Sequence, residues 1–115
     1  MDKEQVHQFV ENAADIAVQK KARDVVSFDL TSITPLFDFQ LIMTCETPEH
    51  CRATANEIAR ELKGKLDSPR MEGEPESGWL VLDFNFFVIN LFLEKARDYY
   101  RLERIWGDLP QKSYA

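Results

Sequence analysis

The chain has 115 residues, which is the size of one compact domain. Hydrophobic residues make up 44% and charged residues 30%, and this usage excludes a wholly disordered or collagen-like chain. Twenty acidic residues against fourteen Lys and Arg give a net charge of −6. This charge argues against nucleic acid as the main partner, because nucleic-acid binders carry a basic footprint.

Cysteine and membrane signals are both weak. Cys45 and Cys51 lie in no CxxC motif and no Cys/His tract, so they predict neither a disulfide framework nor a zinc site. The N-terminal residues 1–5 are polar, unlike a secretory signal. The longest uncharged run, Phe84–Leu93, is far shorter than the ~20 apolar residues of a membrane-spanning helix. We therefore expect a cytoplasmic protein with reduced thiols and no membrane contact.

Residues 3–21 have the pattern of an amphipathic helix, and Asp2 can cap its start. One face carries apolar residues at spacings of three and four: Val6, Phe9, Val10, Ala13 and Ala17. The period then changes to two, and residues 25–30 and 39–44 read as strands. Leu41–Met43 is continuously apolar, which predicts a central strand that is buried on both faces.

Thr47-Pro48 is typical of a helix start, and Gly64 is a plausible stop. Residues 67–78 read as a loop, with a short strand possible near Leu66 or Met71. Residues 79–82 and 86–92 form an antiparallel hairpin in which Asn85 takes the positive φ of the turn. A short helix over 96–100 and an apolar ridge to Trp106 follow, and residues 111–115 read as a loose tail.

This order of elements predicts a single α/β domain over residues 1–110, in which helices cover a mixed sheet of four to five strands. Charge is uneven along it. Residues 24–50 hold five acids and no Lys or Arg, and residues 66–93 hold five acids and one Arg. Two interpretations stay open: a basic partner that docks on the sheet side, or a charge that serves only solubility.

Motifs of catalysis are missing, since no P-loop, GxSxG, GxGxxG or HExxH occurs. His50 and Cys51 are neighbours on a helix and point about 100° apart, which argues against a catalytic dyad. Asp29, Asp38 and Asp83 end strands and could converge on Mg²⁺, as in a nucleotidyl-transfer fold. No Gly-Ser turn accompanies them, so a small nucleotidyltransferase-like enzyme remains only the alternative hypothesis. The aromatic residues of the C-terminal third are either core or docking surface: Trp79, Tyr99, Tyr100 and Trp106.

The C-terminal third carries a specific pattern. It runs through Glu72-Gly73, the segment Gly78–Phe84, the segment Val88–Phe92 and the close Arg97–Trp106, which contains Tyr-x-Leu-Glu-x-x-Trp. With the segments before it, this pattern resembles the ribosomal silencing factor family (RsfS, or Iojap) over about residues 5–108. Departures from the family are Asn90 in place of the usual His, Asn85-Phe86 in place of a Gly-Asp turn, and Cys45-Glu46 in place of small residues.

The resemblance implies a binding protein with no catalysis and no cofactor or metal. Its fold is similar to a nucleotidyltransferase core without the catalytic residues. It implies docking on the large ribosomal subunit through the basic large-subunit protein fourteen, where it blocks joining of the small subunit and represses translation when nutrients are scarce. No sequence-specific nucleic acid is implied, and a homodimer is possible when the protein is free.

The resemblance also implies which residues build the partner-binding surface: Glu72, Gly73, Trp79, Asp83, Asn90, Arg97, Tyr100, Leu102, Glu103 and Trp106. Asn90 keeps a hydrogen-bond donor and an acceptor, but it cannot titrate near neutral pH as a His can.

Overall fold

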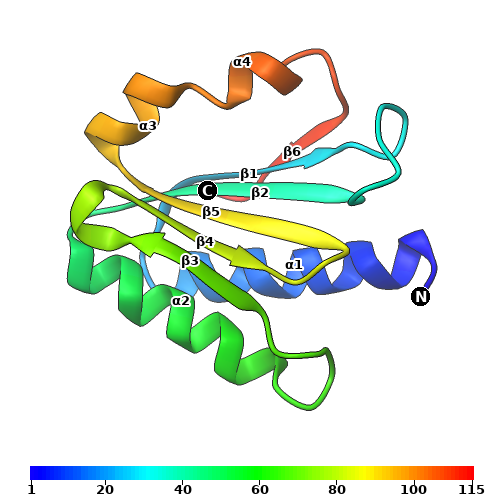
Figure 1. Ribbon diagram of the computed structural model, residues 1–115, viewed down its shortest axis with the longest axis horizontal. Helices are drawn as coiled ribbons and strands as arrows, with labels where there is room; N and C mark the ends of the chain where they lie inside the picture. Colours follow the sequence, from blue (N-terminus) through cyan, green and yellow to red (C-terminus); the bar gives the residue numbers. More distant parts are fainter.

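The computed structural model describes residues 1–115 and shows a mixed six-stranded sheet with helices on both faces (Figure 1). The strand order is β3-β4-β5-β2-β1-β6, and only β2 and β5 run parallel. The strands are β1 (Arg23–Asp29), β2 (Phe39–Cys45), β3 (Arg70–Glu74), β4 (Trp79–Asp83), β5 (Phe87–Leu93) and β6 (Gln111–Ser113).

Two long helices cover one face of the sheet and two short ones lie over the other (Figure 1). The long helices are α1 (Lys3–Gln19) and α2 (Pro48–Leu62), and the short ones are α3 (Glu94–Tyr100) and α4 (Glu103–Trp106). A short 3₁₀ turn, η1 (Pro75–Ser77), joins β3 to β4. Asp2 caps α1 and Thr47 caps α2, as the sequence predicts. No helix is long and apolar enough to cross a membrane.

The face under α1 and α2 holds the main core. Twenty-one buried residues form one cluster there, drawn from both helices and from alternate positions of the strands. All seven residues of β2 are buried, which confirms the prediction of a central strand. The predicted apolar face of α1 is confirmed too, because Val6, Val10, Ala13 and Ala17 are fully buried.

The face under α3 and α4 holds a much smaller cluster. Four buried residues, Phe28, Leu30, Ile42 and Phe92, form its centre, with partly buried residues such as Trp79, Leu102 and Trp106 around them. Neither α3 nor α4 contains a fully buried residue. This cover is therefore thin, and it leaves part of the sheet in contact with solvent.

Two sequence predictions need correction. The loop over 67–78 contains β3, which includes Met71, where the sequence allows a short strand. The sheet has six strands instead of four to five, because β6 forms within the expected tail. Residues 111–113 pair with Val26–Phe28 of β1. Lys112 Nζ lies 2.7 Å from a Glu11 carboxylate oxygen, and the Tyr114 hydroxyl contacts Glu11 and Ser27. The edge strand β1 and Glu11 of α1 thus hold residues 111–114 in place, although the composition of this segment predicts no structure.

Candidate functional site: an open sheet face

The outer strands β3 and β4 expose polar and aromatic side chains on the face that α3 and α4 only partly cover. Glu72 lies opposite Val81 and Glu74 opposite Trp79, so these four side chains share that face. Val81 and Trp79 are half-buried, whereas both glutamates are exposed. We call this surface, together with Tyr100 beside it, the open face. Neither Glu72 nor Glu74 belongs to an ion pair, so both carboxylates are free to meet a cationic partner.

A buried chain of amide groups fixes the indole of Trp79. The indole Nε1 donates to Asn90 Oδ1 at 3.1 Å, and Asn90 Nδ2 donates to Gln40 Oε1 at 2.8 Å. Asn90 and Gln40 are both almost fully buried. A carboxamide both accepts and donates, so one side chain can satisfy both neighbours inside the sheet. The departure from the usual family His therefore keeps a complete hydrogen-bond chain that does not titrate.

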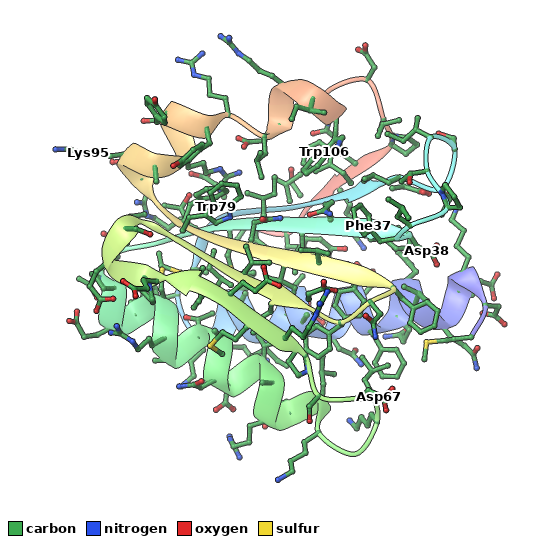
Figure 2. All side chains as sticks on the ribbon, in the orientation of Figure 1. Phe37, Asp38, Asp67, Trp79, Lys95 and Trp106 are labelled. Atoms are coloured by element: carbon green, nitrogen blue, oxygen red, sulfur yellow. The ribbon has the colours of Figure 1, made fainter.

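Aromatic rings stack outward from this chain towards solvent. Trp79 packs between Phe92, with ring centroids 5.0 Å apart, and Tyr100, at 4.7 Å. Tyr100 is 48% exposed. Trp106 packs on Phe28 at 5.7 Å, and Figure 2 shows Trp79 and Trp106 both between the sheet and the α3–α4 segment. The indole N–H of Trp79 points inward, so Trp79 and Tyr100 offer ring surface to the open face.

Arg97 ties α3 to the sheet. Its Nη1 donates to the Asp24 carbonyl at 2.7 Å and to Thr44 Oγ1 at 2.9 Å, and its Nε donates to Glu103 Oε2 at 3.2 Å. The Arg97 side chain is only 11% exposed. Asp24 has a φ of 50°, beside the irregular register of β1, and this turn presents its carbonyl to Arg97. The other carboxylate oxygen of Glu103, Oε1, is buried without a donor.

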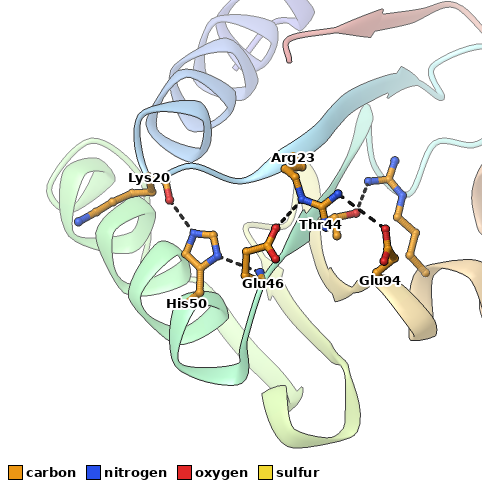
Figure 3. Close-up of polar contacts among 7 residues, drawn as sticks. Lys20, Arg23, Thr44, Glu46, His50 and Glu94 are labelled. Carbon is orange, nitrogen blue, oxygen red and sulfur yellow. Dashed lines mark hydrogen bonds and ion pairs between the residues drawn. The ribbon is translucent and has the colours of Figure 1, made fainter.

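A second polar network lies beside these Arg97 contacts, at the same end of β1 and β2 (Figure 3). Arg23 pairs with Glu46 at 2.6 Å and with Glu94 at 3.7 Å. His50 Nδ1 accepts from the Glu46 N–H at 3.0 Å, and Nε2 lies 2.6 Å from the Lys20 carbonyl, to which it donates. Both ring nitrogens are occupied, so His50 joins α1 to the start of α2 and is not free to activate a thiol.

Cys51 is a core residue, as predicted, and Cys45 lies in the same cluster. Both thiols are free and fully buried. The hydrogen bond with Cys51, together with burial, raises the pKa of Cys45 well above its usual value. A raised pKa disfavours the reactive thiolate.

Asp29, Asp38 and Asp83 do not form a metal site. Asp29 pairs with Lys3 of α1 at 2.8 Å, whereas Asp83 lies on the other face of the sheet and pairs with Arg70 at 2.8 Å. No group of three or more His, Cys, Asp or Glu side chains could hold a metal ion. Asp29 and Asp83 therefore form separate ion pairs on opposite faces of the sheet, and Asp38 forms none.

The structure brings most of the predicted site residues to one side of the sheet and divides them by burial. Glu72, Trp79, Tyr100 and Glu103 reach solvent, whereas Asn90 and Arg97 lie inside and orient them. Leu102 and Trp106 pack into the small cluster under α3 and α4. Asp83 is separate, at the far end of β4. Gly73 has a φ of 87°, and a Cβ there would lie 2.6 Å from the Trp79 carbonyl oxygen, so it lets β3 pair closely with β4.

Sequence reasoning missed three residues of this region: Gln40, Thr44 and Glu74. Gln40, Ile42 and Thr44 are every second residue of β2, so the period of two could have placed all three on one face of the sheet. Their partners Asn90 and Arg97 come from distant segments, through the parallel pairing of β2 and β5.

A mixed sheet with one thick helical layer and one partly open acidic and aromatic face defines a small mixed α/β domain. Comparison with known families is more specific. The family model described as "Ribosomal silencing factor during starvation" matches residues 3–115, and the chain belongs to this RsfS family.

Relatives and solved structures agree with this assignment. The chain is 31% identical over 111 residues to the ribosomal silencing factor RsfS of Halalkalibacterium halodurans, covering 96% of this chain and 92% of the relative. It is 33% identical over 103 residues to RsfS of Bacillus subtilis, covering 85% and 84%. A crystal structure of a Bacillus halodurans protein superposes with a TM-score of 0.70 at 28% identity, covering 97% of this chain and all of that one. A Chromobacterium violaceum protein shares the fold with a TM-score of 0.79 at 23% identity, covering 100% and 94%.

Proposed function

We propose that this protein binds the large ribosomal subunit in the cytoplasm, through the basic large-subunit protein fourteen. Bound there, it blocks joining of the small subunit and represses translation under nutrient limitation. Membership of the silencing-factor family supports the proposal, as does the name of a mouse relative, "Mitochondrial assembly of ribosomal large subunit protein 1", 28% identical over 92 residues.

The open face is the observation that carries this proposal. Glu72 and Glu74 hold two unpaired carboxylates beside the exposed rims of Trp79 and Tyr100. Interfaces concentrate binding energy in a few aromatic and charged anchors, and a negative patch steers a basic partner into place. A basic protein surface complements this set of groups better than a small substrate does, because no enclosed catalytic constellation accompanies it.

Within this proposal the predicted residues take two roles. Glu72, Glu74, Trp79 and Tyr100 contact the partner, whereas Asn90 and Arg97 position them from below. Glu103 supports α3 and α4 from inside, since one carboxylate oxygen binds Arg97 and the other is buried without a donor.

The test is co-sedimentation of the purified protein with large subunits. The double variant Glu72→Lys/Glu74→Lys should fold normally, because both residues are exposed and unpaired, yet bind at least tenfold more weakly. The matched control is Asp15→Lys/Glu61→Lys, which makes the same change of charge at exposed positions of α1 and α2.

Thermal melting of every variant separates folding from binding. Normal melting with weak binding by the open-face variant alone supports the proposal. Equal binding by both double variants and the parent would place the docking surface elsewhere. Large subunits stripped of protein fourteen should bind none of the three proteins.

A further inference from the structure

Two arginines of this acidic protein have no carboxylate partner. Arg101 and Arg104 lie where α3 passes into α4, and both are exposed. Arg101 uses only Nε, which donates to the Asp98 carbonyl at 2.9 Å, and the side chain of Arg104 makes no hydrogen bond to the protein. The other five arginines are all held in ion pairs: Arg23, Arg52, Arg60, Arg70 and Arg97.

The most exposed aromatic ring of the chain lies in the same segment. Tyr99 is 81% exposed, and it packs edge-on against Tyr100, with ring centroids 5.1 Å apart and planes at 89°. The contact with Tyr100 holds the Tyr99 ring in place, while most of the ring remains exposed to solvent. Lys95 precedes Tyr99 by four residues and therefore lies on the same side of α3, also exposed and without an ion pair. Figure 2 shows Lys95 projecting away from the sheet.

The acids of this segment do not neutralise these cations. Glu94 is drawn to Arg23 at 3.7 Å, and Glu103 is held by Arg97 at 3.2 Å. Asp98 and Asp108 are exposed, but neither forms an ion pair. The α3–α4 segment thus presents two free guanidinium groups and an open ring, with the unpaired carboxylates of Asp98 and Asp108 in the same segment. The neighbouring open face presents free carboxylates only.

We infer that the outer side of this segment, made by Lys95, Tyr99, Arg101 and Arg104, contacts the sugar–phosphate backbone of ribosomal RNA next to the docking site. The inference rests on the proposed function, which places a partner on the open face. Planar guanidinium groups match phosphate oxygens, and an exposed Tyr ring can stack on an unpaired base. A protein partner on the same basic side would need acids, and large-subunit protein fourteen is expected to be basic.

The net charge of −6 fits a secondary contact of this kind. The negative net charge of the chain repels free RNA. Two or three phosphate contacts therefore add to the affinity only once the open face holds the protein on the subunit. The contact reads the RNA backbone and not its sequence.

The test compares binding to whole large subunits and to isolated protein fourteen over a range of potassium chloride concentrations. The variant Arg101→Gln/Arg104→Gln should bind large subunits about tenfold more weakly, and the slope of log affinity against log salt should become shallower by about 1.5. Its affinity for isolated protein fourteen should equal that of the parent. The control Lys63→Gln/Lys65→Gln removes two exposed, unpaired cations near the end of α2 and should leave both affinities unchanged.

Each outcome has a defined meaning. Unchanged subunit affinity and salt slope in the arginine variant would overturn the RNA contact, and so would an equal loss in the lysine control. A loss on isolated protein fourteen would show instead that this side meets protein. Failure of the parent itself to bind subunits would refute the proposed function, which is a separate result. The single variant Arg104→Gln, which removes no hydrogen bond, repeats the test if the double variant melts early.

Discussion

The two faces of the sheet differ in how completely their helices cover them. Under α1 and α2, the strands contribute Leu41, Met43, Ile89 and Leu91, all fully buried in a cluster of 21 residues. Under α3 and α4, the same strands contribute Asn90, Gln40 and Thr44 beside a cluster of only four. One face is an apolar core, whereas the other contains a polar network beneath aromatic rings that reach the surface.

Under the proposed function, this difference separates the residues that stabilise the fold from those that bind the partner. The first face holds the larger apolar cluster, whereas the second presents polar groups that a core excludes. Asn90 bonds Trp79 and Gln40, and Arg97 bonds Thr44. These contacts fix the positions of Trp79 and the α3–α4 segment. Substitutions on the first face should therefore change the free energy of unfolding, and substitutions at the exposed rim of the second should change binding.

The largest expected effect compares two neighbours on β4. Leu82 is fully buried against α1 and α2, whereas Val81 is half-buried on the open face. Leu82→Ala should lower the free energy of unfolding by about 3 kcal/mol, because it leaves a cavity in the core. Val81→Ala should lower it by less than ~1 kcal/mol. Urea unfolding measures both, and equal losses would contradict the division between the two faces.

The buried amide chain is the next target. Asn90→Leu leaves Trp79 Nε1 and Gln40 Oε1 without partners, so the free energy of unfolding should fall by about 2 kcal/mol. Adding Gln40→Leu removes one of the two orphaned groups, so the double variant should lose less than the sum of the single losses. If the double variant instead lost as much unfolding free energy as the two single variants together, the two amides would not interact.

Two glycines test the close approach of β3 to β4. Gly73 and Gly64 have φ values of 87° and 84°, so alanine is strained at both. Only at Gly73 would the new Cβ meet another group, the Trp79 carbonyl oxygen at 2.6 Å. Gly73→Ala should therefore cost roughly 1–2 kcal/mol more than Gly64→Ala in urea unfolding. It should also weaken binding to large subunits, since it displaces Glu72 and Glu74.

The smallest expected effect concerns Tyr114, which joins β6 to the α1 side. Burial and the hydrogen bond to Glu11 raise the pKa of Tyr114 from 10.0 to about 12. A raised folded pKa means that this stabilisation is complete below pH 10 and is lost as pH rises from 10 to 12. Because Tyr114 is partly exposed, we expect a loss of only about 1 kcal/mol. Between pH 8 and pH 11.5, Tyr114→Phe should lose less stability than the parent, and Tyr99→Phe should behave as the parent does.

The helices and the two central strands could be predicted because local signals define them. Asp2 and Thr47 cap helices, and the apolar run of β2 marks a central strand. Asn85 takes the positive φ of the predicted hairpin, at 75°. Each of these features depends on residues close together in the chain.

The rest depends on contacts between distant segments. β6 exists because the edge of β1 and Glu11 of α1 hold it, and neither is visible in the composition of residues 111–115. The roles of Asn90 and Arg97 depend on the parallel pairing of β2 with β5 and on the turn at Asp24. The family resemblance named both residues as candidates for partner binding, but it could not show that they are buried.

Site-specific photocrosslinking tests most directly whether the open face is the docking surface. A photoreactive amino acid replaces exposed Glu72 on β3 in one variant and exposed Glu61 on α2 in a control, and each protein is irradiated with purified large subunits. The proposed docking predicts that position 72 crosslinks to large-subunit protein fourteen and that position 61 does not. Crosslinking from position 61 alone, or from neither position while the protein still co-sediments with the subunit, would contradict it.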